Sequence, residues 1–223
     1  MQAQRVYRME VIMSHKSEAL ARQAQSIIKN LQKRNMEGYY FATAAECTQA
    51  ILQEIPAGSR ISWGGSESIR ECGLLDAVHN RDFELIDRTA AKSPEESRLL
   101  FSKAVLSDYY LMSSNAITLD GKLINIDGNG NRVACLVQGS SHVILVVGMN
   151  KVVPDVPSGI ARIRNMASPA NAIRLNRQLP CAMTGTCHDC FSPDCFCNQI
   201  LITRRSGHPG RIKVFLVEET LGY

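Results

Sequence analysis

Residues 143–147, the VILVV of the run HVILVVG, form an uninterrupted apolar segment. A strand with one face in water alternates apolar and polar residues, whereas a continuous apolar run indicates a strand covered on both faces. Such strands occur in parallel sheets, because the helices that connect parallel strands pack over both faces. This segment therefore favours an α/β fold with a mainly parallel sheet.

Helical and extended patterns alternate along the rest of the chain, which agrees with that fold. Apolar residues recur at helical spacing in residues 17–35, 44–55, 93–107 and 154–178, the last long enough for two helices. We expect strands at residues 38–43, 59–65, 82–89, 108–118, 142–148 and 211–219, with a helix after the second of them. Residues 119–139 look like a hairpin with glycine turns.

The charge of the chain restricts its partners. The formal net charge is only +4, and the Lys and Arg residues are scattered, which argues against a nucleic-acid or membrane-binding surface. A small anionic metabolite remains compatible with this balance. The N-terminal residues carry charges throughout, and no apolar run reaches the roughly 18 residues of a membrane span. We therefore expect a soluble, cytoplasmic protein.

The segment PCAMTGTCHDCFSPDCFCNQ, residues 180–199, holds five of the eight cysteines. Cysteine clusters in a reducing compartment are more often metal sites than disulfide frameworks. Several soft thiolates within one short loop suit either zinc or an iron-sulfur cluster. A single Cys-x2-Cys pair inside a compact run favours a cluster over a structural zinc site, but the spacing leaves both open.

Three further segments place glycines and polar residues where predicted strands end. They are WGGSES at residues 63–68, SSNAITLDGKLINIDGNGN at residues 113–131, and Lys151 after the apolar run. Parallel sheets bind ligands at the carboxyl ends of their strands, where backbone amides can approach an anion. Each segment also has a structural explanation, since Ser66 suits a helix N-cap, the Asp-Gly and Asn-Gly pairs are turn signals, and Lys151 suits a solvated charge.

Five runs of the sequence, taken in order, closely resemble the LUD family of lactate-utilization proteins. They are ISWGGSESIRECGLLDAV, SDYYLMSSNAITLDGKLINIDGNGNRVACLVQG, HVILVVGMNKVVPDVPSGIARIRNMASPANAIRL, PCAMTGTCHDC and GRIKVFLVEETLGY. The resemblance implies a single LUD domain over residues 14–223, including the cysteine-rich loop 180–199, preceded by a segment at residues 1–13. It also implies a Rossmann-like fold similar to that of ribose-5-phosphate isomerase, glucosamine-6-phosphate deaminase and CoA-transferases.

The resemblance also implies the residues of a substrate pocket. They are an anion-facing loop of Gly64, Gly65 and Ser66, a centre of Ser114, Asn115, Asp120 and Gly121, a far wall of Asn125, Asp127, Gly128 and Asn131, and Lys151 as the closing residue. The catalytic candidates are Asp120, Asp127 and Lys151. Either aspartate could move protons on a substrate, as a carboxylate does in the similar pocket of methylthioribose-phosphate isomerase.

For the cysteine loop, the resemblance implies that Cys181, Cys187, Cys190 and Cys197 bind one metal centre, with Cys195 as the spare thiol. One LUD relative works in a three-part bacterial system that oxidises L-lactate beside iron-sulfur subunits. The resemblance therefore favours a 4Fe-4S cluster, with zinc as the alternative.

Three functions follow from these expectations. The first is a redox-linked enzyme or subunit that acts on a small hydroxy or keto acid, with iron-sulfur redox partner subunits. The second is a non-redox isomerase or transferase of the sugar-phosphate or CoA-transferase type with a structural zinc loop. The third is a module that senses a metabolite or a redox state. The sequence leaves open whether the chain forms a homodimer.

Overall fold

The computed structural model describes residues 14–223, so the expected segment at residues 1–13 lies outside the described residues. Helices and strands alternate as the sequence predicts, but the strands divide between two sheets. None of the helices in the described part of the chain is long and apolar enough to cross a membrane.

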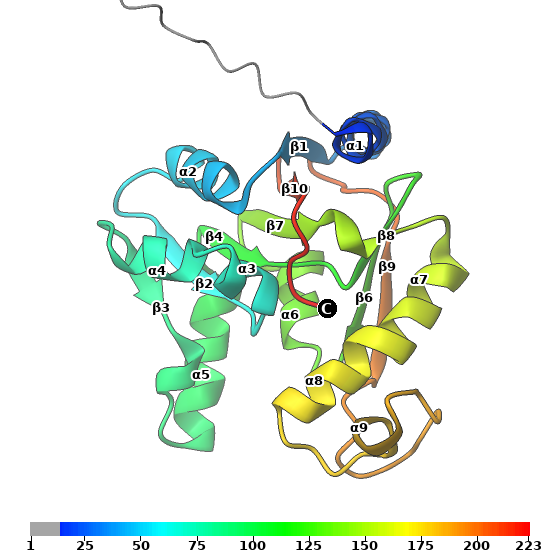
Figure 1. The fold of residues 1–223 in the computed structure, drawn as a ribbon. Helices are drawn as coiled ribbons and strands as arrows, with labels where there is room; N and C mark the ends of the chain where they lie inside the picture. The colour runs from blue at the N-terminus through cyan, green and yellow to red at the C-terminus, as the bar shows by residue number, and fades with distance from the viewer. Residues whose placement is uncertain (1–13) are drawn as a thin grey trace, which may run out of the picture.

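The larger sheet is the predicted parallel sheet (Figure 1). Its six strands, in spatial order, are β1 (Glu37–Phe41), β10 (Ile212–Val217), β7 (His142–Gly148), β4 (Tyr109–Met112), β2 (Arg60–Trp63) and β3 (Glu84–Ile86). Every neighbouring pair is parallel. Residues 143–147 lie on β7 between β10 and β4, and all five side chains are fully buried. The α/β fold with a parallel sheet that this run predicts is confirmed, and it agrees with the Rossmann-like fold that the family resemblance implies.

Helices cover both faces of this sheet. On one face lie α1 (His15–Lys33), α5 (Pro94–Val105) and α6 (Asn131–Val137), and on the other lie α2 (Ala44–Glu54), α3 (Glu67–Glu71) and α4 (Leu74–His79). Val143, Leu145 and Val147 pack in the first core, whereas Ile144 and Val146 pack in the second. Burying these five aliphatic side chains contributes on the order of 10 kcal/mol, which explains why the run has no polar position.

Short hydroxyl residues begin the three longest helices. The side chains of Ser14, Thr43 and Ser93 each accept a hydrogen bond from the backbone N–H three residues later, at 3.1, 3.2 and 3.1 Å. These N-caps satisfy donors that a helix start leaves without partners. They set the beginnings of α1, α2 and α5 close to the positions that the sequence predicts.

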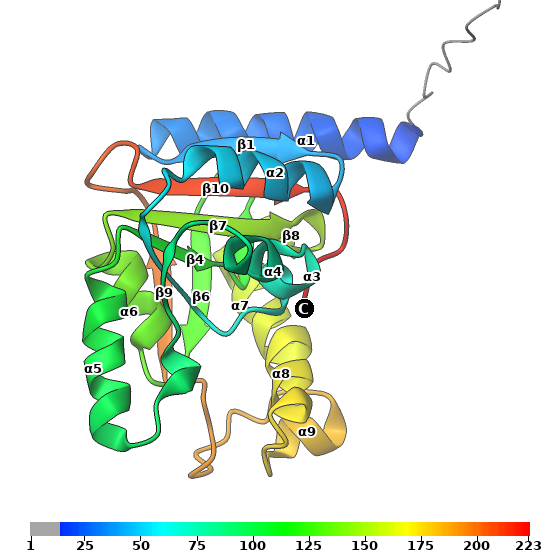
Figure 2. The same cartoon turned by 90° about the vertical axis from the view of Figure 1, so that its left-hand side faces the viewer.

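The smaller sheet was not predicted. Its strands, in spatial order, are β8 (Val152–Val153), β5 (Ala116–Thr118), β6 (Leu123–Asp127) and β9 (Gln199–Thr203). In Figure 2, β6 and β9 run down the view, whereas β7 and β10 run across it. The β5–β6 pair is antiparallel and turns at Gly121, whose φ of 83° favours glycine. This turn is the predicted start of the hairpin.

Two expectations about secondary structure were wrong, and one strand was not expected. Residues 108–118 form two strands in different sheets, because the chain leaves β4 at Ser113 and enters β5 at Ala116. The second half of the expected hairpin is helix α6, which begins after Gly130 with a φ of 74°. Strand β9 follows the cysteine loop directly and lies at the sheet edge, where Ile200 and Ile202 are exposed.

The region 154–178 forms two helices, as expected. These are α7 (Val156–Arg162) and α8 (Ser168–Arg174), joined by a π-helical turn (Ile163–Ala167). The other short elements are α9 (Pro180–Thr184) and the 3-10 turns η1 (Arg88–Ala90) and η2 (Met149–Lys151). Ile163 and Ala167 of the π-helical turn pack against residues of β5, β6 and β8. This turn therefore attaches the α7–α8 region to the small sheet.

Candidate functional site

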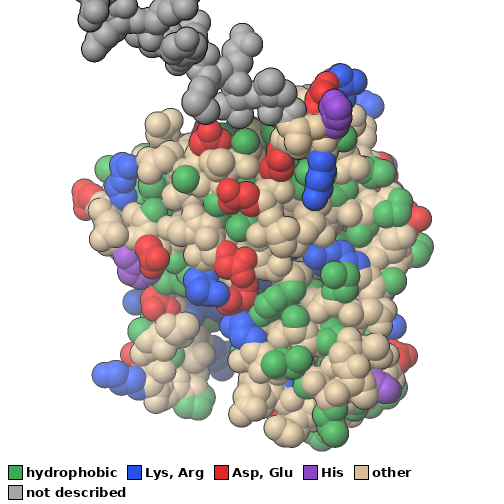
Figure 3. Space-filling model, in the orientation of Figure 1, with side chains coloured by type: hydrophobic (Ala, Val, Ile, Leu, Met, Phe, Trp, Pro, Cys, Tyr) green, Lys and Arg blue, Asp and Glu red, His purple; other side chains and the backbone are tan. Residues whose placement is uncertain are grey.

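A cavity of about 480 Å³, the strand-end pocket, lies where four parallel strands end. Residues 65–68 follow β2, residues 113–115 follow β4, Lys151 follows β7, and residues 222–223 follow β10. The strand order reverses here, because β3 lies on one side of β2 while β4, β7 and β10 follow on the other. Open α/β sheets bind ligands at such a reversal. Figure 3 shows a hollow in the lower half of the molecule with Lys and Arg side chains near its rim.

The loop after β2 supplies the first wall. Gly65 faces open space, since a Cβ there would meet nothing within 4 Å, and Ser66 lines the pocket beside it. Ser66 is also the N-cap of α3, with Oγ 3.5 Å from the N–H of Ile69. Gly64 lies behind the wall, where a Cβ would approach the Tyr110 hydroxyl to 3.2 Å. Two of the three predicted loop residues therefore face the cavity.

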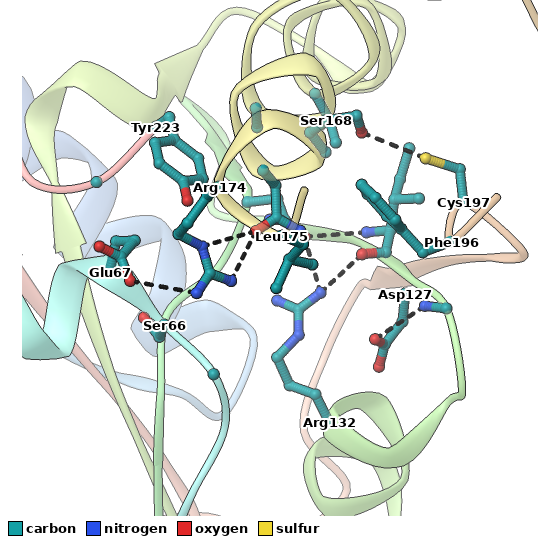
Figure 4. Close-up of a pocket in the computed structure, with 18 of the residues that line it drawn as sticks. Ser66, Glu67, Asp127, Arg132, Ser168, Arg174, Leu175, Phe196, Cys197 and Tyr223 are labelled. Atoms are coloured by element: carbon teal, nitrogen blue, oxygen red, sulfur yellow. Dashed lines mark hydrogen bonds and ion pairs between the residues drawn. The ribbon is translucent and has the colours of Figure 1, made fainter. Parts of the chain in front are cut away.

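Arg132, which the sequence analysis missed, organises the centre of the pocket (Figure 4). Its guanidinium donates to Asn115 Oδ1, Asn125 Oδ1 and the Ile126 carbonyl, each at 2.8 Å, and to the Ser113 carbonyl at 3.3 Å. All four partners are neutral oxygens. Burial lowers the pKa of Arg132, but a guanidinium keeps its proton at neutral pH. The pocket thus contains a fixed positive charge that no hydrogen-bond partner neutralises.

Lys151, which the family resemblance implies as the closing residue, lines the strand-end pocket, and only 3% of the residue is exposed. Its Nζ donates to Ser68 Oγ at 2.6 Å and to Ser113 Oγ at 3.3 Å. Burial, together with the guanidinium groups of Arg162 and Arg132, lowers the pKa of Lys151 to about 7. The structure therefore excludes the explanation that Lys151 is a solvated charge.

The far wall combines lining and supporting residues. Asp127, Gly128 and Asn131 line the cavity, while Asn125 is fully buried behind Arg132. Asp127 accepts backbone hydrogen bonds from Gly128 at 3.0 Å and Val133 at 3.1 Å, so its carboxylate holds the start of α6. At Gly128, a Cβ would come within 2.9 Å of the Phe196 Cβ, so the glycine permits the cysteine loop to approach.

Asp120 and Gly121 are not at the pocket centre, which corrects the expectation drawn from the family resemblance. They form the β5–β6 turn beside α1, outside the cavity lining. Asp120 pairs with Arg34 at 2.8 Å and with Lys122 at 2.7 Å. Although partial burial opposes it, these cations and the Thr118 hydroxyl lower the pKa of Asp120. The Asp-Gly pair therefore serves as a turn, whereas Ser114 and Asn115 do line the pocket.

The rim holds further residues that sequence reasoning missed. Arg174 of α8 reaches toward Glu67 of α3, with a separation of 3.6 Å, and Tyr223 lies beside them (Figure 4). Glu67 also pairs with Arg70 at 2.6 Å. In the sequence, Arg132 is marked only by its place just after Gly130, and Arg174 only by its place near the end of a predicted helical region. Which oxygen atoms face an arginine depends on the packed structure.

All five cysteines of the loop line one small cavity of about 40 Å³, the thiol cavity. Cys181 is buried, and the other four are partly exposed. Cys197 Sγ lies 3.3 Å from Ser168 Oγ, and Leu179 and Phe196 complete the apolar part of the wall. All eight cysteines are free thiols in the structure. The loop therefore brings the predicted ligands Cys181, Cys187, Cys190 and Cys197 to one place.

The thiol cavity suits a soft metal centre by its chemistry but is not arranged as a closed coordination site. Within residues 14–223, no group of three or more His, Cys, Asp or Glu side chains could hold a metal ion. Burial raises the pKa of the Cys181 and Cys197 thiols, so these two groups stay protonated unless a cation compensates them. Residues 185–198 form no helix or strand, and their backbone lacks a regular hydrogen-bond ladder that would oppose movement.

Comparisons with known proteins give a family for this chain. A model of the LUD domain matches residues 24–217. A solved DUF162 family protein from Deinococcus radiodurans is similar with a TM-score of 0.47 and 17% identity, over 92% of this chain and 99% of that one. eIF2B delta from Chaetomium thermophilum gives a TM-score of 0.35 and 18% identity, over 49% of this chain and 48% of that one. No curated protein matches. Because the family model spans residues 24–217 of 223, the chain belongs to the LUD domain family.

Proposed function

We propose that this LUD-family protein is a redox-linked subunit that binds a small 2-hydroxy or 2-keto acid and holds an iron-sulfur cluster beside it. The supporting observation is a shared wall. Ser168, Cys195, Phe196 and Cys197 line both the strand-end pocket and the thiol cavity. A centre in the second cavity would be separated from a ligand in the first by these side chains alone.

The charges of the strand-end pocket favour an anionic ligand. Lys151 and Arg132 donate only to neutral oxygens. By contrast, the carboxylates of Glu67 and Asp194 in the lining are already paired with arginines. The third lining carboxylate, Asp127, acts on Arg132 by its charge, but its hydrogen bonds come from backbone N–H groups. A ligand carboxylate would add negative charge beside both cations, and the burial of Lys151 reduces the screening of that attraction by water.

The hydroxyl or carbonyl group of the ligand requires a proton-transfer group, and Lys151 is suited to that role. A lysine whose pKa is near neutral can both accept and return a proton at physiological pH. Ser68 and Ser113, which accept its hydrogen bonds, hold the amine in place. Asp127 is a weaker candidate because backbone N–H groups of α6 and its neighbour occupy its carboxylate.

Cys181, Cys187, Cys190 and Cys197 would hold the cluster, with Cys195 in reserve. When bound, an iron-sulfur cluster supplies one-electron transfer to or from a partner. Iron-sulfur redox subunits are the partner class that this role requires. Such a cluster occupies more space than the present 40 Å³, so its binding involves an outward shift of the irregular segment 185–198.

Anaerobic purification tests this function directly. We expect iron and acid-labile sulfide in about four copies each per chain, and calorimetric binding of L-lactate or pyruvate. Stoichiometric zinc without sulfide would overturn the redox function and favour the isomerase or transferase alternative. Absence of binding to both acids would overturn the assignment of the strand-end pocket.

A further inference from the structure

The amine of Lys151 is enclosed on three sides by groups without negative charge. Ser68 and Ser113 contribute hydroxyl oxygens at 2.6 and 3.3 Å from Nζ. On the third side lies Gly222, where a Cβ would be 3.2 Å from Nζ and 2.7 Å from Ser68 Oγ. Glycine at this position leaves room around the nitrogen, which remains in the wall of the strand-end pocket.

Charged groups from three helices face this amine, and cations outnumber anions. Arg132 of α6 is adjacent, since its guanidinium donates to the carbonyl of Ser113, the residue whose hydroxyl accepts from Lys151. Arg162 of α7 also acts on the amine, and Glu71 of α3 is the opposing carboxylate. Glu71 already accepts a hydrogen bond from the Gly222 N–H at 2.5 Å. Burial beside cations is the environment that leaves a lysine unprotonated and nucleophilic.

We infer that Lys151 forms an imine with the carbonyl carbon of a 2-keto acid in the strand-end pocket. This inference rests on the proposed function, which places such an acid there. The neutral Nζ attacks the carbonyl carbon to give a carbinolamine, a carbon–nitrogen double bond replaces the carbon–oxygen double bond, and the oxygen leaves as water. No oxidant or reductant enters this step, and protonation of the imine gives an iminium.

The surroundings of Lys151 match the requirements of this reaction. The Ser68 and Ser113 hydroxyls touch Nζ and can move protons between the nitrogen and the departing oxygen. Arg132 attracts the carboxylate of the acid to the same end of the cavity. The iminium would then have the substrate carboxylate as its counter-ion, because the hydrogen-bond partners of Nζ carry no charge.

Reductive trapping of the purified full chain with pyruvate and borohydride tests the inference. We expect a covalent adduct with the mass of pyruvic acid less one oxygen atom, and peptide mapping should place it on Lys151. At pH 7.5 an ordinary lysine with a pKa near 10.4 is less than about 1% neutral. Lys151 should therefore carry roughly a hundredfold more adduct than any surface lysine.

Three variants make the test specific. Lys151→Met and Lys151→Arg should give no adduct, the second while keeping a positive charge. Lys122→Arg, at a partly exposed lysine that pairs with Asp120 outside the pocket, should trap pyruvate as the unsubstituted chain does. If the Lys151 variants fail to fold, the peptide map of the unsubstituted chain decides the question alone.

Calorimetry of pyruvate binding without reductant separates the inference from the proposed function. Binding without an adduct on Lys151 would overturn the imine and leave the acid-binding pocket standing. Equal labelling of several lysines would also overturn it. Absence of binding to both pyruvate and lactate would overturn both proposals together.

Discussion

The strand-end pocket and the thiol cavity share a wall but differ in how their polar groups are held. In the pocket, Arg132 makes four hydrogen bonds and Asp127 accepts two from the backbone. In the thiol cavity, the loop sulfurs make only two hydrogen bonds within residues 14–223, one between Cys197 and Ser168 and one from the Asp189 N–H to Cys187. The residues of the pocket hold one another in place, whereas few hydrogen bonds hold the thiols. On the proposed function, the loop would depend on a bound centre for its order far more than the pocket does.

The largest expected effect concerns that centre. Replacing Cys181, Cys187, Cys190 or Cys197 by Ser should reduce iron in anaerobic protein from about four atoms per chain to less than one, because a ligand is lost. Cys195→Ser is the matched control and should retain most of the iron. Metal and sulfide analysis measures both outcomes, and equal iron loss in all five variants would contradict the assignment of Cys195 as the spare thiol.

Arg132→Met should damage the pocket most. The substitution removes four hydrogen bonds and leaves Oδ1 of the fully buried Asn125 with only the longer bond from the Asn115 N–H at 3.4 Å. This loss should lower the free energy of unfolding by about 3 kcal/mol. Arg174→Met is the control, because its ion pair with Glu67 spans 3.6 Å near the surface and should cost less than about 1 kcal/mol. Urea denaturation distinguishes them, and equal losses would show that Arg132 does not organise the pocket.

Lys151→Met should change the pH dependence of stability. Since the pKa of Lys151 is about 7 in the folded chain and 10.5 is its ordinary value, the unfolded chain binds more protons between these limits. The free energy of unfolding of the unsubstituted chain should therefore rise with pH across that window, by roughly 5 kcal/mol relative to the variant. Denaturation at several pH values measures this difference, and a constant difference would mean that Lys151 is an ordinary lysine.

Asp120→Asn should have the smallest effect. Asp120 pairs with Arg34 and Lys122 at a partly exposed turn, so its loss should lower the free energy of unfolding by less than about 1 kcal/mol. Binding of an acid ligand should be unchanged, because the turn lies outside the pocket lining. Loss of ligand binding in a folded variant would return Asp120 to the site.

Much of the fold could be predicted because its signals are local. The apolar run 143–147 identified a buried parallel strand, and helical periodicity identified α1, α2 and α5. The division of residues 108–118 between two sheets could not be predicted, since apolar residues continue on both sides of Ser113–Asn115. The small sheet depends on pairing between β6 and β9, which are far apart in the sequence, since even the register pair Asp127 and Gln199 is separated by 72 residues.

The site residues that could be predicted from the sequence are those that come directly after a strand of the parallel sheet. Gly65, Asn115 and Lys151 meet in one cavity because three parallel strands end there. Arg132 was missed because its role comes from oxygens on β6 and on the segment between β4 and β5, which only the folded chain brings together. The spacing of the cysteines predicted that they converge, but it carries no information on how far apart the sulfurs lie.

The chain passes from the large sheet to the small one twice at the pocket, through Ser113–Asn115 after β4 and through η2 with Lys151 after β7. Both crossings carry residues that would touch a ligand. A bound acid would therefore contact both connections and hold the two sheets together. Ligand binding should slow hydrogen exchange in β5 and β8 as well as in the pocket loops, since opening the small sheet would first require release of the ligand.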